Sequence, residues 1–221
     1  MSRGAGKGPL AVVFDLDGTL VDSRGDVLEA FRRGFAAVDA PLPPEEALVE
    51  TIGMRLQDCF ERFLGDPERS AAGAAGFRAW YEGHYRDRTA PFAGVDDALR
   101  ALSGRPMAVA TMKKGRFARL LVESFGWAPL LPVVVGAEEG FASKPDPAML
   151  LAALERLGAD PARAAYVGDT AVDARTAAAA GVRFLFAGWG YGRLGAGDPV
   201  PAAVLSSPGE LPRALDGTDA P

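Results

Sequence analysis

The chain has 221 residues with a formal net charge of −5, and 48% of its residues are hydrophobic. These values fit one large domain or a core with a smaller insert, and they exclude wholesale disorder. The negative charge argues against nucleic acid as a partner. No apolar run approaches the roughly 18 residues that a membrane span requires, so we expect no membrane segment. The only cysteine, Cys59, cannot form an internal disulfide, which fits a reducing, cytoplasmic location.

In chain order, short apolar runs alternate with helical patterns, except over residues 24–88. The runs predicted to be buried strands are 10–14, 107–111, 132–136, 164–168 and 183–186. The patterns predicted to be helices are 116–125, 147–157 and 171–180. This alternation predicts an α/β fold with a parallel sheet and right-handed crossovers.

Residues 24–88 interrupt the alternation, because they show several amphipathic helical patterns and no convincing strand. Ser23 and Asp26 resemble a capping box that opens a helix to about residue 38. Further helices are predicted from Glu45, over 56–64 and over 77–88, with a return linker near 89–94. We therefore predict an α-helical insert over 23–89 and a core made of 1–22 and 90–221. Within the core, residues 1–9 are expected to be a short flexible leader, and the chain beyond 213 is expected to fray.

The run of residues 14–23, FDLDGTLVDS, carries the strongest chemical signal. Asp15 and Asp17 follow the first predicted strand directly, and Gly18 permits a sharp turn after them. Two carboxylates so close repel each other, and a bound cation is the simplest way to keep both ionised. Aspartates that only cap a turn are the plain alternative. A calcium loop is excluded, because it would need its glycine at the sixth position rather than the fourth.

Polar residues also end two other predicted strands. Thr111 ends the strand over 107–111, and Asp169 follows the strand over 164–168. Because ligands bind beyond the carboxyl ends of strands in such sheets, Asp15, Thr111 and Asp169 are expected to share one site.

These motifs together resemble the haloacid dehalogenase superfamily in its phosphatase branch, over about residues 10–210. DLDGTLVDS is similar to the first motif, and Thr111 takes the place of the second. Lys144, in the run SKPDP, resembles the third motif, and Asp169 with Asp173 resembles the fourth. The resemblance implies a Rossmann-like core with an inserted helical cap, and the overall pattern is most similar to phosphoglycolate phosphatases.

The resemblance also implies roles for the motif residues. Asp15 would be the nucleophile that forms an aspartyl-phosphate, and Asp17 would be the general acid and base. Thr111 and Lys144 would contact the phosphoryl group. Mg²⁺ would bind Asp15, the backbone carbonyl of Asp17 and Asp169, with Asp173 orienting a metal-bound water. For Asp173, an ordinary acid in the first turn of a helix is an equally good interpretation.

Other residues are expected to contact the substrate. Gly18 and Thr19 of the first motif are assigned to substrate binding by resemblance, together with Met112 and Lys113 after Thr111. Met112 departs from the family pattern, which usually has a small or polar residue there. In the insert, Arg55 within Gly53-Met54-Arg55 is a candidate for a second anionic group, although a surface arginine is at least as good an interpretation.

The remaining notable residues are expected to be structural. Phe77, Trp80, Tyr81 and Tyr85 have helical spacing and fit the core of the insert. Cys59 is expected to be a buried apolar residue, and His84 and Lys114 are expected to be exposed. Residues 189–192, WGYG, are expected to form a structural loop.

The prediction that follows is a Mg²⁺-dependent phosphatase acting on a small-molecule phosphomonoester, with 2-phosphoglycolate as the leading candidate. A sugar-phosphate phosphomutase on the same scaffold is the main alternative, because it would need the same two aspartates. Pyrophosphate, nucleotides and other metabolite phosphates stay open as substrates. A non-catalytic binding protein is disfavoured, because every expected catalytic position is occupied. The sequence leaves open whether the protein is a monomer or a homodimer.

Overall fold

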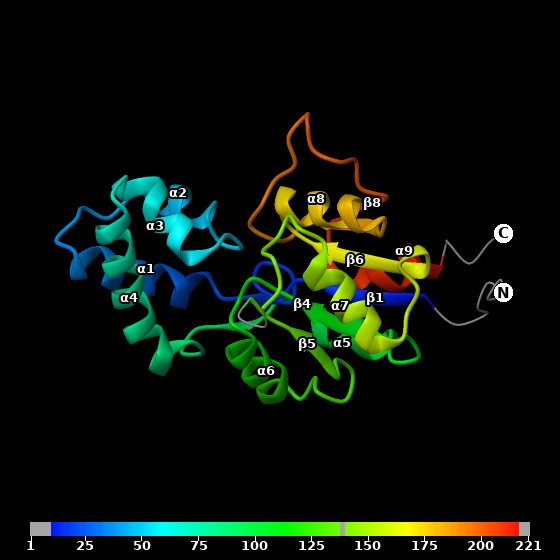
Figure 1. The fold of residues 1–221 in the computed structure, drawn as a ribbon. Coiled ribbons are helices and arrows are strands. Elements are labelled where there is room, and N and C mark those ends of the chain that lie inside the picture. Colours follow the sequence, from blue (N-terminus) through cyan, green and yellow to red (C-terminus); the bar gives the residue numbers. More distant parts are fainter. Residues whose placement is uncertain (1–9, 138–139, 217–221) are drawn as a thin grey trace.

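The computed structural model describes residues 10–137 and 140–216. A helix-rich part and a sheet-containing part lie side by side, and helix α9 (Leu211–Asp216) lies at the end of the sheet part that is remote from the helix-rich part (Figure 1). The predicted leader over 1–9 lies outside the described residues. Among the described helices, none is long and apolar enough to cross a membrane.

The core is a parallel sheet whose six described strands follow the order β5-β4-β1-β6-β7-β8. Its strands are β1 (Ala11–Phe14), β4 (Met107–Ala110), β5 (Val133–Val135), β6 (Ala164–Gly168), β7 (Arg183–Ala187) and β8 (Ala203–Leu205). The central strand β1 pairs with β4 on one side and β6 on the other. This arrangement confirms the predicted α/β parallel sheet, and it brings the carboxyl ends of β1, β4 and β6 next to one another.

Alternating side chains of β1 pack into two separate hydrophobic layers, one on each face of the sheet. Val12 and Phe14 face helices α5 (Val95–Ala101), α6 (Gly115–Ser124) and α9 (Leu211–Asp216). Ala11 and Val13 face α7 (Ala148–Leu157) and α8 (Ala171–Ala180) on the other side. Because both faces of the sheet are covered, its strands are almost continuously apolar.

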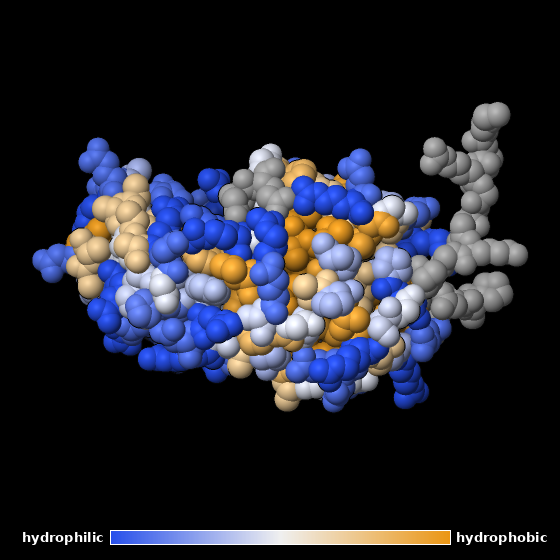
Figure 2. Space-filling model, turned by 90° about the horizontal axis from the view of Figure 1, so that it is seen from below, coloured by the Kyte–Doolittle hydropathy of each residue, from blue (hydrophilic) through white to orange (hydrophobic). Residues whose placement is uncertain are grey.

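Between β2 (Val21–Asp22) and β3 (Ala90–Pro91), which pair antiparallel, the chain forms a group of helices beside the sheet. These are α1 (Arg24–Ala37), α2 (Glu45–Val49), α3 (Leu56–Leu64) and α4 (Pro67–His84), which we call the helical insert. Its core is aromatic: the Phe60 ring lies 5.5 Å from that of Phe31, 5.0 Å from that of Phe35 and 6.5 Å from that of Phe77. On the face in Figure 2, hydrophilic residues cover much of this insert, while hydrophobic residues gather over the sheet part.

The capping box predicted from Ser23 and Asp26 is wrong, because both side chains have other partners. The Ser23 side chain makes no cap hydrogen bond to α1, and its hydroxyl donates to Asp17 Oδ1 at 2.5 Å. The Asp26 carboxylate is fully buried and accepts from the backbone N–H groups of Arg88 and Thr89 at 2.8–3.0 Å, and from the Thr89 hydroxyl at 2.7 Å. Asp26 therefore ties the start of the helical insert to its return linker.

Two other sequence expectations were also wrong. The helix predicted over 77–88 begins much earlier, at Pro67, because the Asp66 side chain accepts from the Arg69 N–H at 2.8 Å and caps the helix. The prediction that the chain beyond 213 frays is wrong for residues 214–216, because α9 continues to Asp216 with Leu215 fully buried; residues 217–221 lie outside the described residues. Strand β8 and helices α5 and α9 were not predicted at all.

Candidate active site

Asp15 lies at the carboxyl end of β1, in the middle of the sheet. Its N–H donates to the carbonyl of Val167 at 2.9 Å, so the residue continues the pairing of β1 with β6. The chain then turns through Gly18, whose φ is +83°, and a Cβ there would lie 2.3 Å from Oδ2 of Asp169. Only glycine permits this approach, which brings the turn after β1 against the residue after β6.

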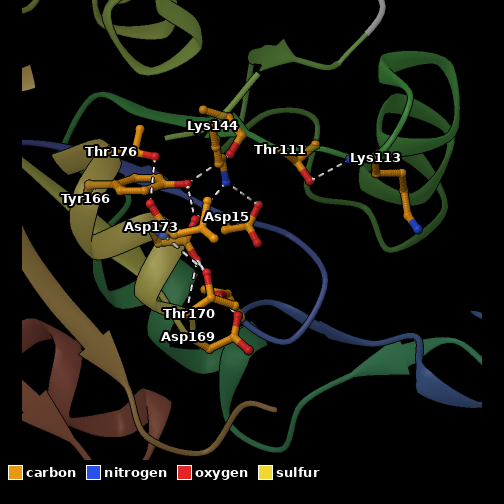
Figure 3. Close-up of polar contacts among 12 residues, drawn as sticks. Asp15, Thr111, Lys113, Lys144, Tyr166, Asp169, Thr170, Asp173 and Thr176 are labelled. Atoms are coloured by element: carbon orange, nitrogen blue, oxygen red, sulfur yellow. Dashed lines mark hydrogen bonds and ion pairs between the residues drawn. The ribbon is translucent and has the colours of Figure 1, made fainter. Parts of the chain in front are cut away.

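Lys144 lies between two buried carboxylates. Its Nζ is 2.8 Å from Asp15 Oδ1 and 2.8 Å from Asp173 Oδ1, and its side chain is 2% exposed (Figure 3). Burial alone would lower the pKa of Lys144, but Asp15 and Asp173 outweigh it and raise that pKa. The lysine is therefore a permanent cation that fixes the position of Asp15.

Asp173 is held by several contacts at once. It forms a reciprocal capping box with Thr170 at the start of α8, and its Oδ1 lies 2.9 Å from the Tyr166 hydroxyl (Figure 3). Both interpretations of Asp173 from the sequence thus meet in one side chain, because it caps a helix and also pairs with Lys144.

Asp169 is fully buried and is fixed from two sides. The Thr19 hydroxyl donates to its Oδ1 at 2.9 Å, and the backbone N–H groups of Tyr191 and Gly192 donate to its Oδ2 at 2.9 and 3.3 Å. The loop after β7 can approach so closely because residue 190 is glycine: a Cβ there would lie 2.3 Å from Asp169 Cβ.

Among the described residues, Asp15, Asp169 and Asp173 form a buried carboxylate cluster whose ligand atoms lie within 4.8 Å of one another. Burial raises the pKa of Asp15 to about 6, against the opposing effect of Lys144. Burial, reinforced by the charges of Asp173 and Asp15, raises the pKa of Asp169 to about 8. Negative charge thus exceeds what Lys144 neutralises. Oxygen ligands with excess negative charge suit a hard divalent cation, so the cluster fits Mg²⁺.

The Asp17 carboxylate lies apart from that cluster and has a different partner. Its Oδ1 lies 2.9 Å from Nζ of Lys113, a side chain that is 5% exposed. The same Nζ lies 2.6 Å from the hydroxyl of Tyr81 in α4. Burial alone would lower the pKa of Lys113, but Asp17 and Tyr81 outweigh it and raise it. Lys113 therefore joins the residue proposed as acid and base to the helical insert.

A cavity of about 310 Å³ opens between the helical insert and the carboxyl edge of the sheet. Asp15, Asp17 and Thr111 line its floor, and residues of α1, α4 and the α2–α3 loop line its walls. The cavity is therefore the place where a ligand would meet Asp15.

Comparison with known proteins now identifies the family. The sequence model described as haloacid dehalogenase-like hydrolase matches residues 12–187. The chain belongs to the haloacid dehalogenase-like hydrolase family. It is similar to the probable phosphatase IndB of Dickeya dadantii, at 36% identity over 81% of each chain. It is also similar to the phosphoglycolate phosphatase of Xylella fastidiosa strain Temecula1, at 35% identity over 83% of this chain and 82% of that one.

A third relative in the family carries a different name. The tyrosine-protein kinase PtkA of Mycobacterium tuberculosis is 32% identical over 85% of this chain and 65% of that protein. Its solved structure superposes with a TM-score of 0.81, covering 95% of this chain and 99% of that chain, at 30% identity. These findings confirm the predicted Rossmann-like fold and the resemblance to the phosphatase branch of haloacid dehalogenase-like hydrolases, and they make the chain a phosphatase-type hydrolase.

The structure brings most of the residues expected from the family motifs to this site. Asp15, Lys144, Asp169 and Asp173 meet in one cluster, with Thr19 bonded to Asp169. Thr111 is 1% exposed, and its hydroxyl oxygen accepts from the Lys113 N–H at 3.2 Å. Met112 lines the cavity and is half-buried, whereas Arg55 is exposed at its rim. Gly18 serves the turn described above. The roles assigned to these residues stay predictions.

The sequence does not reveal the contacts that three tyrosines make around the site. The helical spacing of Tyr81 predicts only a place in the insert core, yet its hydroxyl also contacts Lys113. Tyr191 was placed in a structural loop, and its hydroxyl lies 2.7 Å from the Ser23 N–H and 2.8 Å from Asp22 Oδ1. Tyr166 gave no signal within its apolar strand. The glycine-rich run around Tyr191 was the one available hint, because glycines permit close backbone approach.

The expected structural residues are buried or exposed as predicted. Cys59 is buried, and burial raises the pKa of its thiol to about 11, which leaves it unreactive at neutral pH. His84 is exposed and pairs with Asp87 at 2.7 Å. Lys114 is exposed as well.

Proposed function

We propose that this protein is a Mg²⁺-dependent phosphatase that hydrolyses a small phosphomonoester through an aspartyl-phosphate on Asp15. The observation that carries the proposal is the buried group of Asp15, Lys144, Asp169 and Asp173 at the edge of the cavity. Such a group has little value for stability, because burying several like charges is unfavourable, so it is best explained by a reaction.

Asp15 and Asp169 would hold the metal, together with the backbone carbonyl of Asp17, and Asp173 would orient a water bound to it. When bound, the cation would neutralise negative charge on the transferring phosphoryl group. The fit rests on the excess of buried carboxylates over cations in this cluster.

The chain's own residues would then carry out two steps. A carboxylate oxygen of Asp15 attacks phosphorus, while Asp17 gives a proton to the departing alkoxide. Asp17 next removes a proton from a water, which attacks the phosphorus of the aspartyl-phosphate and regenerates Asp15. Lys144 offsets the charge of Asp15 and the phosphoryl oxygens, and the Thr111 hydroxyl donates to one of those oxygens.

Residues 23–89 would act as a cap, with the core formed by 1–22 and 90–221. The helical insert supports this assignment because it covers the cavity that contains Asp15. Closure of the cap would exclude water other than the one that reacts. Gly18, Thr19, Met112 and Lys113 would line the phosphoryl site, and Arg55 would meet a second anionic group in those substrates that carry one.

The names of related proteins put 2-phosphoglycolate first among the substrates to test, with sugar phosphates, nucleotides and pyrophosphate after it. The decisive experiment measures phosphate release from such a panel with added Mg²⁺, with Asp15→Asn as the blank. We expect release by the wild type, loss of all release in Asp15→Asn, and loss after chelation of divalent metal. Appreciable turnover by Asp15→Asn would refute the mechanism. Return of the phosphoryl group to a sugar, without net phosphate release, would favour a phosphomutase.

A further inference from the structure

The cavity above Asp15 has mainly apolar walls. Val27 and Phe31 of α1, Ile52 and Met54 of the α2–α3 loop, Phe77 of α4 and Phe117 of α6 all line it. A small dianion gains nothing from such walls, whereas burial of a ring or branched alkyl group against them is favourable.

The cavity is also larger than a two-carbon acid needs. Its volume is about 310 Å³, at the lower end of the roughly 300–1,000 Å³ typical of pockets for drug-sized organic ligands. A phosphoryl group on Asp15 would leave room beyond it for a ring-sized group.

The cations of the cavity are poorly placed for a carboxylate close to the phosphoryl group. Among the described residues that line the cavity, Lys113 is the buried cation, and it is already paired with Asp17. Lys144 lies beside Asp15 but does not line the cavity, and it is paired with Asp15 and Asp173. Arg55, Arg78 and Lys114 also line the cavity, but they are exposed at its rim, where ion pairs are weak.

Met112 gives an independent sign from the sequence. It follows Thr111 directly and lines the same cavity, half-buried. The chain therefore offers an adaptable apolar side chain, with no strong hydrogen-bonding group, directly beside the residue expected to contact the phosphoryl group.

We propose that the cavity selects phosphate monoesters of apolar, ring-sized alcohols over 2-phosphoglycolate. This inference rests on the proposed function, because it names the substrate class for the same site. The alcohol's apolar group would lie between the α2–α3 loop, Phe117 and Met112, with its oxygen towards Asp17.

The test compares benzyl phosphate, ethyl phosphate and 2-phosphoglycolate in the full-length protein with Mg²⁺, by phosphate release. All three have alkoxide leaving groups, so differences in kcat/KM report the cavity rather than leaving-group acidity. Burial of the ring should raise kcat/KM for benzyl phosphate over ethyl phosphate by about tenfold to a hundredfold. The kcat/KM for benzyl phosphate should also exceed the kcat/KM for 2-phosphoglycolate.

Failures of the two proposals are distinguishable. If kcat/KM for ethyl phosphate or for 2-phosphoglycolate equals or exceeds that for benzyl phosphate, the substrate class is wrong and the phosphatase function stands. If none of the three esters is hydrolysed but another ester of the panel is, the substrate class is again wrong and the phosphatase function stands; if no ester of the whole panel is hydrolysed, both proposals are wrong.

A variant tests the location of the ring. Met112→Asn should lower the ratio of kcat/KM for benzyl phosphate to that for ethyl phosphate by about threefold or more. The matched control is Leu120→Asn, the same kind of change on α6 at a side chain that is 39% exposed and does not line the cavity. The ratio cancels losses of folded protein or of general activity. An unchanged ratio in Met112→Asn would overturn the placement of the ring beside that residue.

Discussion

Without divalent metal, the free energy of unfolding of this protein should fall as the pH rises through neutrality. Burial raises the pKa of Asp169 from 3.8 to about 8. Between these two values the folded chain retains a proton that the unfolded chain has lost. Stability therefore falls with rising pH in this window, because the folded state binds more protons. Asp15, with a pKa of about 6, has lost most of its proton at neutral pH.

The size of this loss of stability follows from the one proton by which the folded and unfolded chains differ. Each pH unit changes the free energy of unfolding by about 1.4 kcal/mol per proton difference, so a rise from about pH 6 to about pH 7.5 costs about 2 kcal/mol. For a chain of this size, that corresponds to a Tm lower by about 4–8 °C. The raised pKa values of Lys113 and Lys144 do not enter, because stability from these lysines is lost only at pH values above their ordinary range.

The assay is thermal unfolding in excess chelator across this pH range, followed by circular dichroism. Asp169→Asn is the matched variant, because it removes the titrating group with little change of shape. Its Tm should vary much less with pH. Added Mg²⁺ should raise the wild-type Tm more at the higher pH, since the cation must displace the proton. A wild-type Tm that stays constant or rises with pH, or an equal fall in Asp169→Asn, would refute this reasoning.

Three further changes test particular contacts. Gly190→Ala places a Cβ against Asp169 and should raise the Mg²⁺ concentration needed for half-maximal phosphatase rate by about tenfold. Gly83→Ala is the control, because its added Cβ would meet no atom within 4 Å, and it should leave that Mg²⁺ concentration unchanged. Lys144→Met leaves the buried carboxylates without their cation, so we expect loss of phosphate release and destabilisation by about 3–5 kcal/mol in denaturant unfolding; retained activity would contradict its role. Phe60→Ala removes the fully buried ring at the centre of the insert core and should cost about 3–5 kcal/mol of unfolding free energy, and a cost below about 1 kcal/mol would show that the insert repacks.

The sequence by itself determined the sheet and the motif residues. Continuous apolar strands such as β6 and capped helices such as α8 depend on local pattern, and both were predicted with the bounds that the structure has. Asp15 and Asp169 were recognisable because parallel strands end at one edge. The short strand β8 escaped prediction, and helix α4 was predicted only from residue 77, because an edge strand and an alanine- and glycine-rich helix carry little periodicity.

Only the tertiary structure decided which partners the side chains have. Ser23 and Asp26 have the spacing of a capping box, yet in the folded chain Ser23 bonds to Asp17, six residues before it, and Asp26 bonds to the return linker, 63 residues after it. The Tyr191 hydroxyl accepts a hydrogen bond from the backbone N–H of Ser23, 168 residues away at the start of the helical insert, and no local sequence pattern predicts such a contact. Likewise, the reaction class follows from a few motif residues, but the apolar cavity that selects the substrate exists only where the insert packs over the sheet, because its walls come from segments far apart in the chain.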